Sequence, residues 1–240
     1  MTTLFISDLH LSAQRPGAVE LFLRFARDRA VRTSALYILG DLFDAWIGDD
    51  DESELAAAVR GALRAVTNAG AAVHFQAGNR DFLVGERFTA ATGVVLLPEA
   101  TVAEVGGAPA LLMHGDQLCT DDVDYQQARR LLRSPEFVAD FLAKPLAARA
   151  AIAAEYRRRS GEAISLKAED IMDVNAGAVV ETMRAHGVRR LIHGHTHRPA
   201  RHAFVLDGVP AERIVLAEWH EHEGQCLSAG PRDLAIERVC

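Results

Sequence analysis

The chain has 240 residues, of which 49% are hydrophobic and 25% are charged. This length and composition suffice for one domain with a sizeable core and exclude a disordered chain. The formal net charge of −7 argues against a general nucleic-acid-binding protein, which normally carries an excess of basic residues.

Short apolar runs alternate with longer segments of helical periodicity, which predicts an α/β fold. The N-terminal strand, residues 3–6, begins without the basic start and long apolar stretch of a signal peptide. The next elements are a helix at 18–30, a strand at 35–39 and a helix at 52–69. Strands then follow at 72–75, 94–97, 101–105 and 110–113, and after a helix at 174–186 come strands at 191–193 and 213–216.

The segment 121–167 differs from the rest because it is rich in alanine and arginine and lacks a strand-like run. Pro135 and Pro145 divide it, and its apolar residues follow helical spacing. We interpret it as a helical lid inserted into a core of residues 1–120 and 168–240. Its apolar residues fit either contact with a lipid or packing within the lid: Phe137, Val138, Phe141, Leu142, Leu146, Ile152 and Tyr156.

Basic residues of the same segment allow two interpretations. Arg149 and the run 157–159 either face anionic head groups at a membrane surface or form a solvated helix end. No apolar run approaches the ~20 residues that span a bilayer. The three cysteines are too few and too scattered for a disulfide framework or a thiolate zinc site. We therefore expect a cytoplasmic protein that is able to rest on a membrane.

A polar motif follows directly on each of five predicted strands. The informative side chains that follow the strands are Asp8, Asp41, Asn79, His114 and His195. In α/β sheets, ligands bind outside the carboxyl ends of the strands, where several loops converge. These motifs are therefore predicted to meet at one site.

The side chains of these motifs are typical metal ligands. Taken alone, the Asp8-Leu9-His10 motif is more often a pair of ordinary loop residues, and Gly40-Asp41 equally fits a turn that ends a strand. The three histidines of His193-Gly194-His195-Thr196-His197 are hard to explain by packing. Together the motifs offer three or four ligands for each of two cations, and this sulfur-free set suits Mn, Fe or Zn.

The order of these motifs resembles the calcineurin-like metallophosphoesterase superfamily. The resemblance implies a four-layer αββα sandwich with two metal ions that share Asp41. It places one ion among Asp8, His10, Asp41 and His197, and the other among Asp41, Asn79, His114 and His195. Many members carry histidine after the asparagine, where this chain has Arg80.

Longer segments are similar to a narrower family, the pyrophosphatases that hydrolyse UDP-2,3-diacylglucosamine in lipid A biosynthesis. They are residues 7–11, 37–43, 45–51, 114–122, 171–175 and 191–199. This resemblance implies an enzyme with two Mn²⁺ ions, which directs water at the UMP-side phosphorus and releases UMP and 2,3-diacylglucosamine 1-phosphate. It further implies a monomer at the cytoplasmic face of the inner membrane of a Gram-negative bacterium, with an acylated UDP-sugar as partner and no nucleic acid.

The same resemblance implies roles for individual residues. Catalytic roles fall on Asp41, Asn79, Arg80 and His195. Substrate contacts fall on Asn79, Arg80, Asp122, Ser160, Ile164, Lys167 and His195, with Ile164 standing where a polar asparagine is expected.

Two alternatives remain open from the residues alone. The core motifs equally suit a dinucleoside polyphosphate hydrolase or a protein phosphatase, from which an apolar lid would distinguish a lipid-directed enzyme. A non-catalytic scaffold on the same fold would have lost metal ligands, and none of the ligand positions is lost here.

Overall fold

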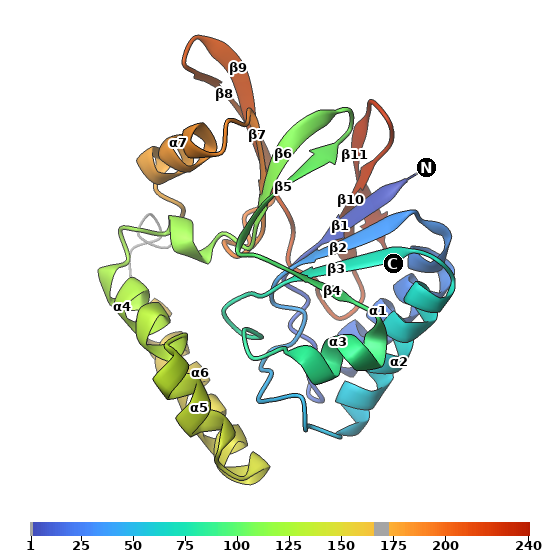
Figure 1. The fold of residues 1–240 in the computed structure, drawn as a ribbon, viewed down its shortest axis with the longest axis vertical. Coiled ribbons are helices and arrows are strands. Elements are labelled where there is room, and N and C mark those ends of the chain that lie inside the picture. Colours follow the sequence, from blue (N-terminus) through green and yellow to red (C-terminus); the bar gives the residue numbers. More distant parts are fainter. Residues whose placement is uncertain (1, 166–172) are drawn as a thin grey trace.

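Two β-sheets form the centre of the computed structural model, which describes residues 2–165 and 173–240, the side chains of 160–165 excepted (Figure 1). The six-stranded sheet has the order β11-β10-β1-β2-β3-β4, and the five-stranded sheet has the order β5-β6-β7-β9-β8. Strands β1 to β4 are parallel, whereas β10 and β11 join that sheet in antiparallel pairings. In the other sheet β6, β7 and β9 are parallel, with antiparallel β5 and β8 at the two edges.

The strands are β1 (Thr3–Ile6), β2 (Ala35–Leu39), β3 (Ala72–Gln76), β4 (Val95–Leu97), β5 (Ala100–Val105), β6 (Ala108–Met113), β7 (Arg190–His193), β8 (Ala200–Leu206), β9 (Val209–Val215), β10 (Gly224–Ala229) and β11 (Leu234–Val239). The α-helices are α1 (Pro16–Asp28), α2 (Glu54–Asn68), α3 (Glu86–Thr92), α4 (Val123–Leu132), α5 (Pro135–Leu142), α6 (Leu146–Ser165) and α7 (Ala176–Ala185). Two short 3₁₀ helices, η1 (Ala30–Arg32) and η2 (Asp116–Leu118), complete the described elements.

Alternate residues of the central strands point to opposite faces of each sheet, and this divides the core into three clusters. In β1, Leu4 and Ile6 pack with α1, α2 and α3, whereas Phe5 packs between the sheets. In β7, Ile192 belongs to the cluster between the sheets and Leu191 to a third cluster with α7. The resulting order of helices, sheet, sheet and helix confirms the predicted four-layer αββα sandwich (Figure 1).

Sequence periodicity did not reveal α3, β8, β10 and β11. Helix α3 has only seven residues, too few to show a period. Strand β10, Gly224–Ala229, contains glycine and serine, which are poor strand formers. Strands β8 and β11 lie at sheet edges, where most side chains face solvent and the apolar pattern is weak.

Helices α4, α5 and α6 extend away from the sheets as a separate projection (Figure 1). Pro135 occupies the first turn of α5, and Pro145 directly precedes α6, as the prolines predicted. The rings of Phe137 and Phe141 stack with centroids 6.0 Å apart, and Tyr156 of α6 meets Phe137 edge-on. Aromatic contacts of these helices therefore hold α5 against α6.

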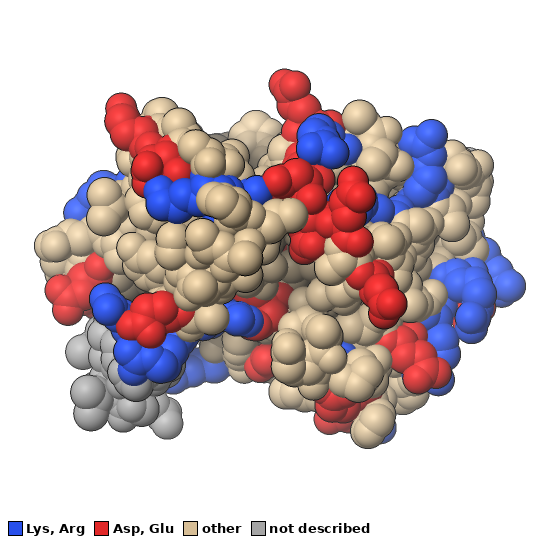
Figure 2. Space-filling model, turned by 90° about the horizontal axis from the view of Figure 1, so that it is seen from below, with Lys and Arg blue, Asp and Glu red and all other residues tan. Residues whose placement is uncertain are grey.

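The described helices include none that is both long and apolar enough to cross a membrane. On the face seen from below, an uncharged area on the side of α4, α5 and α6 lies between acidic and basic residues (Figure 2). Charges of both signs alternate across this face instead of forming a continuous basic surface.

Candidate metal centre

The predicted ligands lie at the carboxyl ends of strands from both sheets. Asp8 follows β1 and Asp41 follows β2, and the backbone N–H of Asp8 donates to the carbonyl of Gly40 at 3.1 Å. In the other sheet, the N–H of Gly194 donates to the carbonyl of His114 at 2.8 Å. A Cβ atom at Gly194 would lie only 2.1 Å from Asp8 Oδ2, so only glycine allows the two sheets' loops to meet here.

The backbone at these positions is left-handed, a conformation that non-glycine residues seldom adopt. Of the described residues, six non-glycine ones have positive φ, and five of them are predicted metal ligands. Strained backbone conformations of this kind occur mostly at functional sites, where the surrounding structure enforces them. The five ligands are Asp8 (55°), His10 (49°), Asp41 (54°), His195 (69°) and His197 (54°).

One group of donor atoms forms around Asp8. Its carboxylate is fully buried and accepts hydrogen bonds from the Ser7 hydroxyl at 2.6 Å and from the backbone N–H of His195. His197 Nε2 lies 3.5 Å from Asp8 Oδ1 and 3.2 Å from His10 Nε2. Ligand atoms of Asp8, His10 and His197 all lie within 4.8 Å of one another, as the donors around a single cation do.

A second group contains Asp8, Asp41 and His114, again with donor atoms within 4.8 Å of one another. Asp41 lies between the two groups, because its Oδ2 is 3.9 Å from His10 Nδ1 and 3.7 Å from His114 Nε2. The backbone N–H of Arg80 donates to the other oxygen of Asp41 at 2.8 Å, which fixes the orientation of the carboxylate.

Asn79 extends the second group. The Nδ1 of His114 faces the carbonyl of Leu39 at 2.9 Å and donates to it, so in the neutral ring, the form that binds a metal, the lone pair lies on Nε2. That Nε2 faces another acceptor, Asn79 Oδ1, at 3.0 Å, and His195 Nδ1 lies 3.0 Å from the same oxygen. Facing acceptors repel unless a positive charge lies among them, so this donor set fits a divalent cation.

Burial adds a further electrostatic reason for positive charge here. Asp8 and Asp41 are both buried, and among the described residues their ion pairs are with histidines. Burial raises the pKa of Asp41 to about 6, although its contacts with His114 and Arg80 act in the opposite direction. Two buried carboxylates side by side are costly unless cations compensate them.

Asp81 ties the two loops of the six-stranded sheet together. Its buried carboxylate accepts hydrogen bonds from the backbone N–H groups of Leu42 at 2.7 Å and Gly78 at 2.8 Å. Residues of the loop after β2 and of the loop after β3 thereby share one acceptor. The relative position of Asp41 and Asn79 follows from this bridge.

The remaining predicted substrate contacts are only partly described. Asp122 caps α4 by accepting from the N–H of Tyr125 at 3.0 Å. Lys167 lies outside the described residues, and the side chains of Ser160 and Ile164 do as well. Arg80 is half-buried beside Asp41, in the centre itself.

The interpretation of Arg149 as a contact for membrane head groups is wrong. Its side chain is only 3% exposed and donates to Asp50 Oδ1 at 2.8 Å and to the carbonyl of Ile47 at 2.6 Å. Arg157 likewise pairs with Asp44. Both arginines form ion pairs with acidic residues of the long loop after β2. These ion pairs attach α6 to the sandwich.

The fold and the donor set are those of a metallophosphoesterase, and the sequence profile of the calcineurin-like phosphoesterases matches residues 1–199. A UDP-2,3-diacylglucosamine hydrolase from Cellvibrio japonicus is 52% identical over 236 residues, 98% of each chain. Proteins of that name from Serratia proteamaculans and Escherichia coli are 52% and 49% identical, over 92% and 98% of each chain. The chain therefore belongs to the calcineurin-like phosphoesterases and, within them, to the family of the UDP-2,3-diacylglucosamine hydrolases. Membership of this superfamily implies divalent metal ions.

Sequence motifs did not reveal Glu218, which follows β9 and belongs to no recognised pattern. Its Oε2 lies 3.0 Å from His197 Nδ1, the ring nitrogen that faces away from His10. Burial lowers the pKa of His197, but the hydrogen bonds to Asp8 and Glu218 outweigh it and raise that pKa to about 10. A carboxylate in this position orients a histidine ligand and increases its basicity.

We expect Glu218→Gln to weaken the binding of a divalent cation by about 10- to 100-fold, as removal of a carboxylate that supports a metal ligand does. Calorimetric titration of metal-free protein with Mn²⁺ measures this directly. The matched control is Glu223→Gln, because Glu223 is exposed and pairs only with Arg238 among the described residues. Equal affinities in both variants would show that Glu218 does not support His197.

Proposed function

We propose that this protein hydrolyses the diphosphate of UDP-2,3-diacylglucosamine, with release of UMP and 2,3-diacylglucosamine 1-phosphate, in lipid A biosynthesis. The observation that carries the proposal is the 49–52% identity to relatives of that name over at least 92% of each chain. The donor groups around Asp8, Asp41 and Asn79 support it, because diphosphate hydrolysis suits a pair of cations.

In this proposal two Mn²⁺ ions bind to the ligands that the superfamily pattern predicts. Asp8, His10 and His197 would hold one ion, Asn79, His114 and His195 would hold the other, and Asp41 would serve both. Bound divalent cations act as Lewis acids and lower the pKa of water.

The chain's own groups complete the site. Arg80 follows Asn79 directly and would place its positive charge beside the phosphoryl oxygens as negative charge develops on them. The Leu39 carbonyl and Glu218 would keep the rings of His114 and His197 in the tautomer that presents Nε2. Oriented in this way, the ligands need no rearrangement when substrate binds.

Hydrolysis in ¹⁸O-water tests the proposal. We expect the acylated UDP-sugar to yield UMP that carries the label, because attack is proposed at the phosphorus attached to uridine. Mass spectrometry of both products measures it, with a chelator-treated sample as the control. Label in the sugar phosphate would reverse the site of attack, and absence of either product would contradict the proposed substrate.

We further propose that the predicted lid, residues 121–167, receives the acyl chains beside the inner membrane. Helices α4, α5 and α6 belong to this lid. The two residues at the end of α5 differ in what they can do there. Phe141 is buried and stacks on Phe137, so it serves packing within the lid. Leu142 is 41% exposed and remains available to a lipid.

We expect Leu142→Ser to reduce kcat/KM for the diacylated substrate by about tenfold, because burying one leucine side chain is worth roughly 1.5–3 kcal/mol. Hydrolysis of a small soluble phosphodiester should stay within twofold of the unchanged protein. Val205→Ser is the matched control, since Val205 is exposed on the distant β8–β9 hairpin. Equal loss on both substrates would show that Leu142 supports the fold and does not bind lipid.

A further inference from the structure

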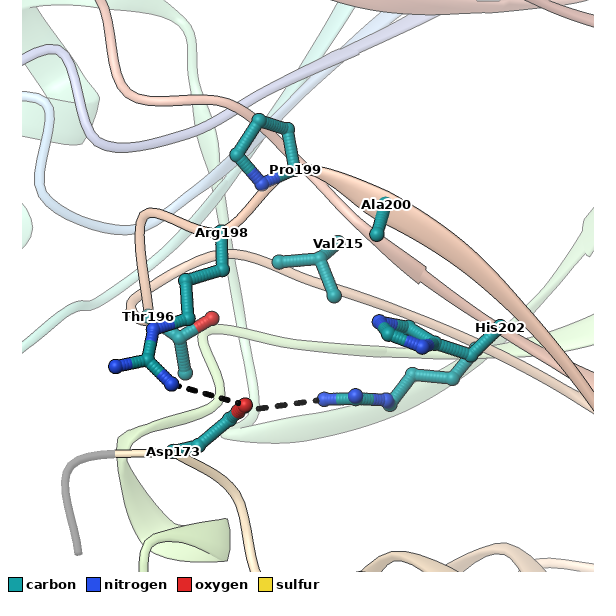
Figure 3. A pocket seen from close by; sticks show the side chains of 8 residues that line it. Asp173, Thr196, Arg198, Pro199, Ala200, His202 and Val215 are labelled. Carbon is teal, nitrogen blue, oxygen red and sulfur yellow. Dashed lines mark hydrogen bonds and ion pairs between the residues drawn. The ribbon is translucent and has the colours of Figure 1, made fainter. Parts of the chain in front are cut away.

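A cavity of about 260 Å³ lies beside the metal centre, between the segment before α7 and the β8–β9 hairpin (Figure 3). Its apolar wall contains Val215, Pro199 and Ala200. Its polar wall comes from Asp173, Arg198 and Arg213, joined by Thr196 and His202. None of these residues is a predicted metal ligand.

The polar wall has a regular arrangement of donors and acceptors. Asp173 lies between two arginines, with Oδ2 at 3.4 Å from Arg198 Nη1 and Oδ1 at 3.6 Å from Arg213 Nη1 (Figure 3). A guanidinium carries five N–H donors and a carboxylate about four acceptor sites, so these two ion pairs use only part of the hydrogen-bonding capacity of each group. The wall therefore presents a donor, an acceptor and a donor in sequence.

Thr196 links this cavity to the metal centre. It stands in the chain between the predicted ligands His195 and His197, and it lines the cavity. Its Oγ1 is buried and has no hydrogen-bond partner among the described residues. A buried hydroxyl without a partner is costly, so this group is suited to a hydrogen bond with a ligand in the cavity.

We propose that this cavity binds the uracil base of the substrate, an inference that rests on the proposed hydrolysis of a UDP-sugar. The edge of uracil presents an acceptor, a donor and an acceptor, in O4, N3–H and O2. Asp173 accepts from N3–H, while Arg198 and Arg213 donate to the two carbonyl oxygens. The apolar wall packs against the ring.

The same wall disfavours other ligands. A phosphate group would suit two arginines, but the carboxylate of Asp173 between them repels an anion. Cytosine carries an amino donor in place of O4 and an acceptor at N3, so it leaves both Asp173 and one arginine without a partner. Adenine and guanine present larger rings with different edges.

Binding of mononucleotides to the Mn²⁺-loaded protein tests the proposal without any measure of turnover. We expect calorimetry to give at least about tenfold tighter binding of UMP than of CMP or 3-methyl-UMP. Both CMP and 3-methyl-UMP lack the N3–H donor and would leave Asp173 without a partner. The three nucleotides carry the same ribose phosphate, so a difference in their affinities comes from the base alone. In Asp173→Asn, an isosteric change, the preference should fall to about twofold or less.

The matched control is Arg184→Gln, which breaks another arginine–aspartate pair, with Asp207, outside the cavity. It should keep the UMP preference. Equal binding of UMP and 3-methyl-UMP by the unchanged protein would overturn the proposal, even if the acylated UDP-sugar is hydrolysed. Conversely, a clear UMP preference without hydrolysis of that sugar would leave the base site standing and refute the proposed reaction. If Arg184→Gln lost the UMP preference as Asp173→Asn does, the loss would be a consequence of disturbed folding. That result would also overturn the proposed uracil site.

Discussion

Replacing Asp41 by alanine is expected to lower kcat/KM by well over 100-fold, more than the 10- to 100-fold cost of losing an outer-shell group. The reason is its position, since Asp41 Oδ2 lies within 4 Å of His10 Nδ1 and of His114 Nε2. A cation in either donor group therefore loses a ligand. Steady-state hydrolysis and metal content by mass spectrometry after dialysis measure the two effects, and we expect the variant to retain less than one cation per chain.

The control for this variant is Asp28→Ala, because Asp28 is an exposed carboxylate on α1 that pairs with Arg27. Its activity and metal content should equal those of the unchanged protein. If Asp41→Ala kept near-normal turnover with Mn²⁺, a shared carboxylate would be the wrong description of this site.

Replacing Asp116 by alanine is expected to lower the free energy of unfolding by about 3 kcal/mol, as the loss of one partner from a buried ion pair does. The carboxylate of Asp116 is buried and accepts from Arg129 Nε at 2.7 Å and from the Tyr125 hydroxyl at 2.9 Å. Both partners belong to α4, so this contact attaches the projecting helices to the loop that follows His114. Urea unfolding measures the global change, and hydrogen exchange of the α4 amides should accelerate most.

Glu99→Ala provides the matched control, because Glu99 pairs with Arg129 and Arg133 from an exposed position. We expect a loss of less than about 1 kcal/mol, which is typical of surface ion pairs. An equally small loss in Asp116→Ala would mean that α4 is attached by its other contacts.

The sequence predicted the α/β class and the location of the site because both depend on local patterns, whereas the four-layer sandwich was implied by the resemblance to the superfamily. The short continuous apolar runs of β1 and β7 predict strands buried on two faces, and a motif directly after a strand predicts a side chain at its carboxyl end. The histidines after β7 illustrate this, since His195 and His197 meet Asn79 and Asp8 from the other sheet.

Groups that act on the ligands from a distance could not be predicted in the same way. Glu218 is a single acidic residue after β9, and only the fold brings it to His197. Arg149 is one of many arginines in its segment, and nothing local distinguishes a buried partner of Asp50 from a solvated side chain. Periodicity reports which face of an element is apolar, but it does not report which charges will meet.

The left-handed backbone of the five predicted ligands has a thermodynamic consequence for the metal-free protein. Each such residue costs about 1 kcal/mol relative to glycine, and five together approach the lower end of a typical domain's stability, roughly 5 kcal/mol. Glycine would relieve this cost at every position but could bind nothing. A cation that binds the folded centre and not the unfolded chain would offset this cost, so we expect thermal denaturation to shift to higher temperature as the centre is loaded.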